Sequence, residues 1–148
     1  MKLLLLQKWC QAPWHAWLKE EPLWLNLFAE LWSKLPENAV RQILLSSRTF
    51  IALPPVNQSY TFRITQPLPL GAHFLLLDFS LIKRPITQSI AILAHEMAHL
   101  CIPPTADPAQ NDLLADKLVL KWGLKKELLE ALSQDLDNGH PRVTNLTA

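Results

Sequence analysis

The spacing of apolar residues predicts helices in the first third of the chain. In residues 21–35 apolar side chains recur at spacings of one, three and four, which is typical of a helix with a broad apolar face. Residues 36–47 continue as a second predicted helix. Residues 2–8 resemble a signal peptide, but their apolar run is shorter than a signal core and ends at Lys8. They therefore predict the opening of a helix in a cytoplasmic protein.

The hydrophobic pattern changes in the middle of the chain and returns to a helical period afterwards. Short apolar or alternating runs at 49–53, 60–65 and 73–79 predict three strands, because proline and glycine punctuate the segments between them. After Pro85 the period is again three to four, and it predicts helices over about 86–100, 108–122 and 125–137.

This order of elements predicts a single α+β domain over residues 1–148. Residues 1–47 form its Trp- and Leu-rich helical part, and residues 48–137 contain a short sheet of about three strands and the helices after it. Residues 138–148 are polar and predict a loose tail.

Composition narrows the class of protein and of partner. The chain has 148 residues, of which 49% are apolar, and a net charge of +1. This balance excludes a disordered chain and provides no basic field for nucleic acid. The longest apolar stretch is too short to span a membrane, so we expect no membrane partner. The two cysteines, Cys10 and Cys101, have no CxxC spacing and predict reduced, packed thiols.

The predicted helix at 22–35 carries an unusually wide aromatic face. Its pattern is typical of a core helix. Tryptophan is also enriched at contact hot spots, so the same face could instead form a homodimer or bind a partner protein through Trp24, Phe28 and Trp32.

Residues 95–99 read His-Glu-Met-Ala-His, a match to the pattern His-Glu-x-x-His on a predicted helix. Residues four apart lie on one helical face, so His95 and His99 can direct ring nitrogens at one metal ion. Glu96 lies beside that ion, where it can take a proton from a metal-bound water and pass it to a leaving amine. The alternative is two histidines at the edge of the core.

A catalytic zinc ion needs a third protein ligand, and the next predicted helix offers two carboxylates on one face. Asp112 would complete the metal site, and Asp116, one turn later, would accept the free N–H of a zinc-bound imidazole. The alternative is that both are ordinary carboxylates near a helix N-terminus, where the helix dipole favours them.

Together these residues resemble the gluzincin branch of zinc metallopeptidases, and most closely the small bacterial and phage-type minigluzincins. The resemblance rests on residues 95–99, on the pattern Asp112-x-x-Ala115-Asp116 and on residues 121–123, and it covers about 49–123. It implies a small zincin-like domain with one Zn²⁺ per chain, His95, His99 and Asp112 as ligands, and hydrolysis of a protein or peptide substrate. The family normally has Glu where this chain has Asp112.

Two alternatives stay open at this point. Because Asp is one methylene shorter than Glu, the chain could be an impaired pseudo-peptidase that binds proteins through its Trp-rich helices. It could also be a structural domain with a fortuitous motif. Tyr60 and His140 are candidates to stabilise the oxyanion of peptide hydrolysis. The resemblance further implies that a substrate pairs in extended form with a strand before the active-site helix, among 60–65 or 73–79.

Overall fold

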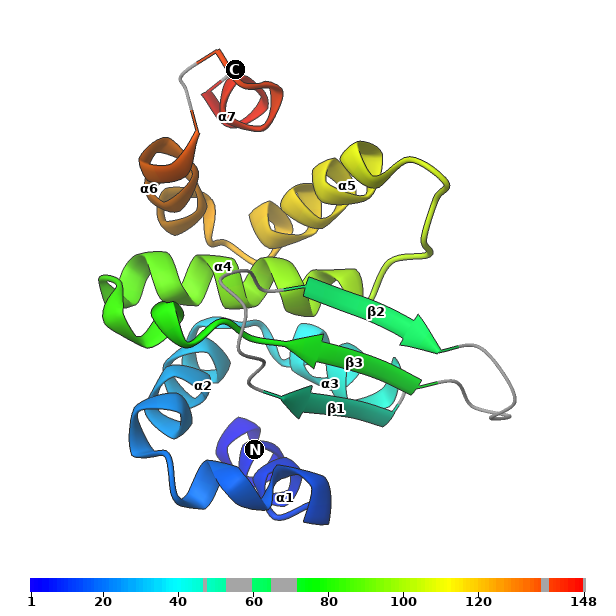
Figure 1. Cartoon of the computed structure of the whole chain (residues 1–148), viewed down its shortest axis with the longest axis vertical. Helices are drawn as coiled ribbons and strands as arrows, with labels where there is room; N and C mark the ends of the chain where they lie inside the picture. The colour runs from blue at the N-terminus through cyan, green and yellow to red at the C-terminus, as the bar shows by residue number, and fades with distance from the viewer. Residues whose placement is uncertain (47, 53–59, 65–71, 137–138, 148) are drawn as a thin grey trace.

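The computed structural model describes residues 1–46, 48–52, 60–64, 72–136 and 139–147 of the chain. Along these residues helices come first, three short strands follow, and helices continue to the C-terminus (Figure 1). The order agrees with the hydrophobic pattern, whose period changes from about 3.6 to 2 and back.

The N-terminal part consists of α1 (Lys2–Cys10), the 3-10 helix η1 (Pro13–Lys19), α2 (Pro22–Lys34) and α3 (Glu37–Ser46). Helix α2 begins with proline at its first position, where the missing N–H costs no helical hydrogen bond. The Lys2 ammonium donates to the carbonyl oxygens of Ser33 (2.7 Å) and Leu35 (2.9 Å). These bonds hold the start of α1 against the end of α2.

The sheet contains β1 (Arg48–Ala52), β2 (Tyr60–Ile64) and β3 (Ala72–Leu76) in the order β1-β3-β2. Each strand forms in a segment where the pattern predicted one. Strand β1 runs parallel to β3, and β2 runs antiparallel to β3. Because β3 is central and paired on both sides, the described strand edges without a partner strand belong to β1 and β2.

After the sheet come the 3-10 helix η2 (Phe79–Lys83) and the helices α4 (Ile86–His99), α5 (Pro108–Lys121), α6 (Lys125–Asp135) and α7 (Pro141–Thr147). The carboxylate of Asp107 accepts the N–H of Ala109 at 2.9 Å and caps α5, as the Asp-Pro sequence predicts. Gly123 follows α5 with a φ of 87°, which stops the helix at low steric cost.

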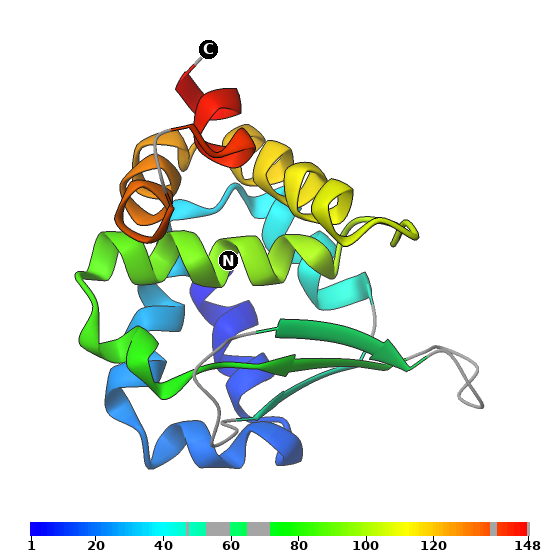
Figure 2. The ribbon, with the colours of Figure 1, turned by 45° about the horizontal axis from the view of Figure 1, so that its top comes forward.

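Helix α4 crosses the middle of the molecule and is packed on both sides. Helices α5, α6 and α7 lie on one side, and the sheet and the N-terminal helices lie on the other (Figure 2). Ala91, Ala94 and Ala98 are fully buried, and these small side chains allow α2, α5 and α6 to approach α4. Buried apolar side chains from Leu6 to Leu146 form one hydrophobic cluster around it.

The structure corrects the predicted fold class. The predicted class, a small zincin-like α+β domain, was wrong. The described part of the chain is mainly helical, with seven α-helices and three strands of only five residues each. Leu75 is the one strand residue among the described buried apolar side chains; the others lie on helices or on their connections. Most of the described buried apolar side chains therefore come from helices.

The C-terminal residues are also different from the prediction. Within 138–148, expected to be a loose tail, residues 141–147 form α7, whose Val143 and Leu146 are buried against the core. The sequence contains a signal for this helix, because Pro141 is at its first position and the two apolar residues are three apart.

The aromatic face of α2 is core and not a surface. The side chains of Trp24, Phe28 and Trp32 are all fully buried within the chain. The interpretation as a core helix is therefore confirmed. Burial of these side chains argues against a dimer or partner contact through them, and that contact stays a prediction. Among the described residues no helix has the length and apolar character needed to cross a membrane.

Candidate metal centre

Helices α4 and α5 bring three predicted ligands to one place. The two Nε2 atoms of His95 and His99 are 3.1 Å apart, and the Asp112 Oδ1 atom is 3.6 Å from the first and 3.4 Å from the second. In a tetrahedral zinc site with ligand distances near 2 Å, two ligand atoms are separated by about 3.3 Å. The three atoms therefore have the spacing of three corners of such a site.

The length of the third side chain is sufficient. Asp112 is one methylene shorter than the Glu that the family resemblance implied, yet its Oδ1 atom reaches both imidazoles. Helices α4 and α5 are in direct contact, and Ala94 and Ala98 on α4 and Ala115 on α5 are fully buried. The Asp112 side chain therefore comes within 3.6 Å and 3.4 Å of the two rings in spite of its shorter length.

The ring of His95 is oriented by a second carboxylate. Its Nδ1–H donates to the Oδ1 atom of Asp116 at 2.8 Å, and Asp116 is 3% exposed. In the neutral ring, a proton at Nδ1 leaves the lone pair on Nε2, which is the atom that faces His99 and Asp112. The position predicted for Asp116 beside a ligand histidine is thus present in the structure.

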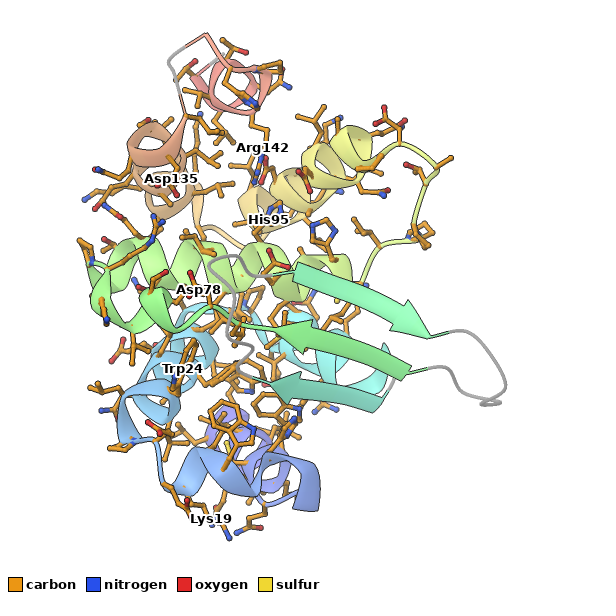
Figure 3. The ribbon with its side chains drawn as sticks, in the orientation of Figure 1. Lys19, Trp24, Asp78, His95, Asp135 and Arg142 are labelled. Carbon is orange, nitrogen blue, oxygen red and sulfur yellow. The ribbon has the colours of Figure 1, made fainter. Side chains whose placement is uncertain are left out.

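A residue that the sequence reading missed completes the group. Arg142, from α7, donates from Nε to the Oδ2 atom of Asp116 at 2.7 Å and from Nη2 to its Oδ1 atom at 2.8 Å. Figure 3 shows the side chain of Arg142 directed from α7 toward the region where His95 is labelled. Nothing in the local sequence links Arg142 to the motif, because the contact joins residues 26 apart.

These contacts set the charge of the carboxylates. Hydrogen bonds with His95 and His99 hold the pKa of Asp112 well below its ordinary value. Burial raises the pKa of Asp116, but the hydrogen bonds from Arg142 and His95 outweigh it and the net pKa is lowered. Both carboxylates are therefore ionised at neutral pH, as metal binding and imidazole orientation require.

The pKa of the His95 imidazole is shifted in the opposite direction from the pKa values of the two carboxylates. Burial lowers the pKa of His95, but the interactions with Asp112 and Asp116 outweigh it, so the net pKa is raised. A ring between two carboxylates attracts a positive charge, and a metal ion at Nε2 would supply that charge in place of a proton.

The metal group opens onto a cleft of about 620 Å³. His95, Glu96, His99 and Asp112 lie in its wall, and Glu96 itself is 8% exposed. The rest of the wall mixes apolar side chains, among them Leu128 and Leu132 of α6, with polar ones such as Asp78, Asn111 and Arg142. Arg84 and Asp135, which are joined by an ion pair at 2.8 Å, also line the cleft.

The other sequence candidates lie outside this group. His140 is exposed, its Nδ1 atom accepts the backbone N–H of Arg142, and it does not line the described cleft. Tyr60 lies on β2, and its side chain is outside the part of the structure that is described. Their oxyanion role stays a prediction. Cys10 and Cys101 are free thiols, which confirms that they are not bridged, and neither belongs to the described metal group.

Comparison with known proteins identifies no relative. No family model matches the sequence, and no curated protein and no solved structure shows significant similarity to it. The structure therefore shows a group of His95, His99 and Asp112 that could hold a metal ion. Its two histidines have the His-Glu-x-x-His spacing.

Proposed function

We propose that the chain is a zinc-dependent peptidase that hydrolyses peptide bonds in a protein or peptide substrate. The observation that carries the proposal is the tetrahedral spacing of two imidazole nitrogens and one carboxylate oxygen at the wall of a cleft. Two histidines and a carboxylate are a typical ligand set for catalytic zinc, which keeps its fourth position open. The side chain of Asp112 is 43% exposed, so the group faces solvent on one side.

Glu96 is the proposed general base and acid. Zinc bound at this site would supply Lewis acidity, which lowers the pKa of water toward about 7 and polarises a carbonyl group. Glu96 accepts a proton from the attacking water and then gives it to the leaving amine. The C–N bond of the peptide breaks, a C–O bond to the water oxygen forms, and the second water proton stays on the new carboxyl group.

The cleft supports an extended substrate with an apolar side chain near the scissile bond. Leu128 and Leu132 of α6 line the cleft together with the metal group, and β2 contacts α4. Of the two strands considered for substrate pairing, β3 has a partner on each edge and β2 has one edge without a described partner strand. Pairing with β2 is therefore the arrangement we favour.

The pseudo-peptidase alternative is less well supported. It requires Trp24, Phe28 and Trp32 on a binding surface, and all three are fully buried. The shortened third ligand, which motivated that alternative, reaches both histidines.

Metal content tests the ligand set first. The purified protein is expected to contain close to one zinc per chain, and Asp112→Ala is expected to lose most of it. Asp107→Ala is the matched control, since Asp107 is an exposed carboxylate at the start of the same helix and only caps it. Absence of zinc in the wild type after reconstitution would refute the metal site.

Substrate cleavage tests the chemistry separately. A mixture of unstructured peptides is incubated with the zinc-loaded protein, and new termini are identified by mass spectrometry. Glu96→Gln is expected to retain zinc and to lose cleavage by 10²-fold or more, roughly the contribution of a general base. Cleavage that persists at the wild-type rate in Glu96→Gln would exclude the proposed role of Glu96.

A further inference from the structure

Helix α7 is attached to the molecule by two kinds of contact. Its apolar side chains, Val143 and Leu146, are buried, and α7 packs against α6. Its one cationic side chain, Arg142, points the other way, toward α5 and the metal group. A helix of seven residues has little stability alone, so α7 depends on these contacts to form.

The guanidinium of Arg142 engages both carboxylates of α5. Its Nε and Nη2 atoms bind the two oxygens of Asp116, and its Nη1 atom lies 3.9 Å from the Oδ2 atom of Asp112. The Oδ1 atom of Asp112 is the one that faces the histidines. Arg142 and a metal ion would therefore use different oxygens of Asp112, with the carboxylate between the two cations.

Asp116 depends on Arg142 for its charge balance. At 3% exposure, Asp116 has almost no access to solvent, and a buried carboxylate needs a charged or hydrogen-bonding partner. Arg142 supplies two hydrogen bonds in a planar fork, which fixes the plane of the carboxylate. That plane in turn fixes the His95 ring, so the position of α7 is transmitted to the Nε2 atom that would bind the metal.

We propose that α7 is a clasp for the metal site, in which Arg142 is the positioning residue, so that docking of α7 and binding of the metal stabilise each other. The inference rests on the proposed metal site and goes beyond it, because it assigns a regulatory role to the C-terminal helix. Since such coupling is reciprocal, anything that releases α7 weakens metal binding, and metal binding holds α7 in place.

The test uses the full chain and two measurements, zinc affinity by competition with a chromophoric chelator and hydrogen exchange with and without zinc. In the wild type, zinc is expected to slow exchange in residues 141–147 by about tenfold or more. Arg142→Ala is expected to weaken zinc binding by about 10–100-fold, the usual effect of removing a group that orients a metal ligand.

Two further variants separate a clasp from a general packing effect. Arg142→Lys is expected to bind zinc with intermediate affinity, because it keeps the charge and loses the two-pronged geometry. Thr144→Ala is the matched control on α7, as its hydroxyl is exposed and bonds only within the helix turn, and it is expected to bind zinc as the wild type does.

The outcomes distinguish the inference from the proposed function. Equal zinc affinity in Arg142→Ala and the wild type, or no effect of zinc on exchange in α7, overturns the clasp and leaves the metal site in place. A wild-type protein that binds no zinc overturns both. Loss of peptide cleavage alone, with zinc binding and α7 protection intact, overturns only the peptidase.

Discussion

The two sides of α4 differ in what they bury. On the N-terminal side Trp24, Phe28 and Trp32 are fully buried, and among residues 1–46 no Asp, Glu, Lys or Arg is buried. On the C-terminal side Glu96 and Asp116 are buried next to His95. Apolar packing needs no further ligand, whereas buried carboxylates need cations nearby. One side of α4 therefore buries mainly apolar side chains, and the other buries Asp116, whose charge Arg142 balances, next to a group that could hold a metal ion.

The largest expected effect is a loss of stability when an aromatic side chain on the N-terminal side of α4 is removed. The ring of Trp32 lies 5.5 Å from Trp9 and 6.1 Å from Phe28, centroid to centroid. Trp32→Ala is expected to lower the free energy of unfolding by about 3–5 kcal/mol, because it removes a large buried ring and leaves a cavity. Urea denaturation measures the loss.

A control and a metal measurement complete this test. Leu23→Ala changes a side chain that is 59% exposed on the same helix, and is expected to alter stability by about 0.5 kcal/mol or less. The zinc affinity of folded Trp32→Ala should equal that of the wild type. A large fall in that affinity would show that the two sides of α4 are not independent.

Zinc itself is expected to stabilise the C-terminal side of α4, where Glu96 and Asp116 are buried. At a free concentration 100 times its dissociation constant, a ligand that binds only the folded state adds about 2.7 kcal/mol to the free energy of unfolding. We expect the melting temperature to rise with zinc and to fall again with a chelator. Among amides that exchange by local opening, the gain in protection should be largest in α4 and α5, and equal gain for such amides in α1 would contradict the comparison.

Asp116→Asn tests one buried carboxylate on the C-terminal side of α4. The asparagine side chain has nearly the shape of the aspartate side chain, but it is neutral and cannot balance the positive charge of Arg142. It also holds the His95 ring less firmly. Zinc affinity is expected to fall by about 10–100-fold, measured by chelator competition. Asp107→Asn is the control, because asparagine also caps a helix well, and its zinc affinity should not change.

The smallest expected effect concerns the two thiols, Cys10 on α1 and Cys101 just after α4. Cys10 is buried, and burial raises its pKa; for Cys101 burial raises the pKa to about 12. Since the thiolate is the reactive form, both should react slowly with iodoacetamide at pH 8 in the native protein. In Trp32→Ala we expect Cys10 to react faster and Cys101 to stay slow, as identified by mass spectrometry of the alkylated peptides. Parallel acceleration of both would indicate one cooperative unit.

The helices and strands could be predicted largely from local pattern. Asp107 caps α5 and Gly123 ends it, as their residue types predicted, because capping and turn conformation depend on a few neighbouring atoms. The fold class was less accessible. A pattern that predicts strands does not show how much of the core a sheet supplies, and most of the described buried apolar side chains lie on helices or on their connections.

The placement of His95 and His99 on one helical face follows from the sequence alone, because a spacing of four on one helix is a local property. It also indicated Asp112 and Asp116, which share a face of the next helix. Only the tertiary structure decided that the Asp112 carboxylate reaches both imidazoles, that the tryptophans of α2 are core, and that Arg142 binds Asp116. Each of these depends on how separate helices pack, and packing distances between residues 13 or more positions apart are not encoded in any local period.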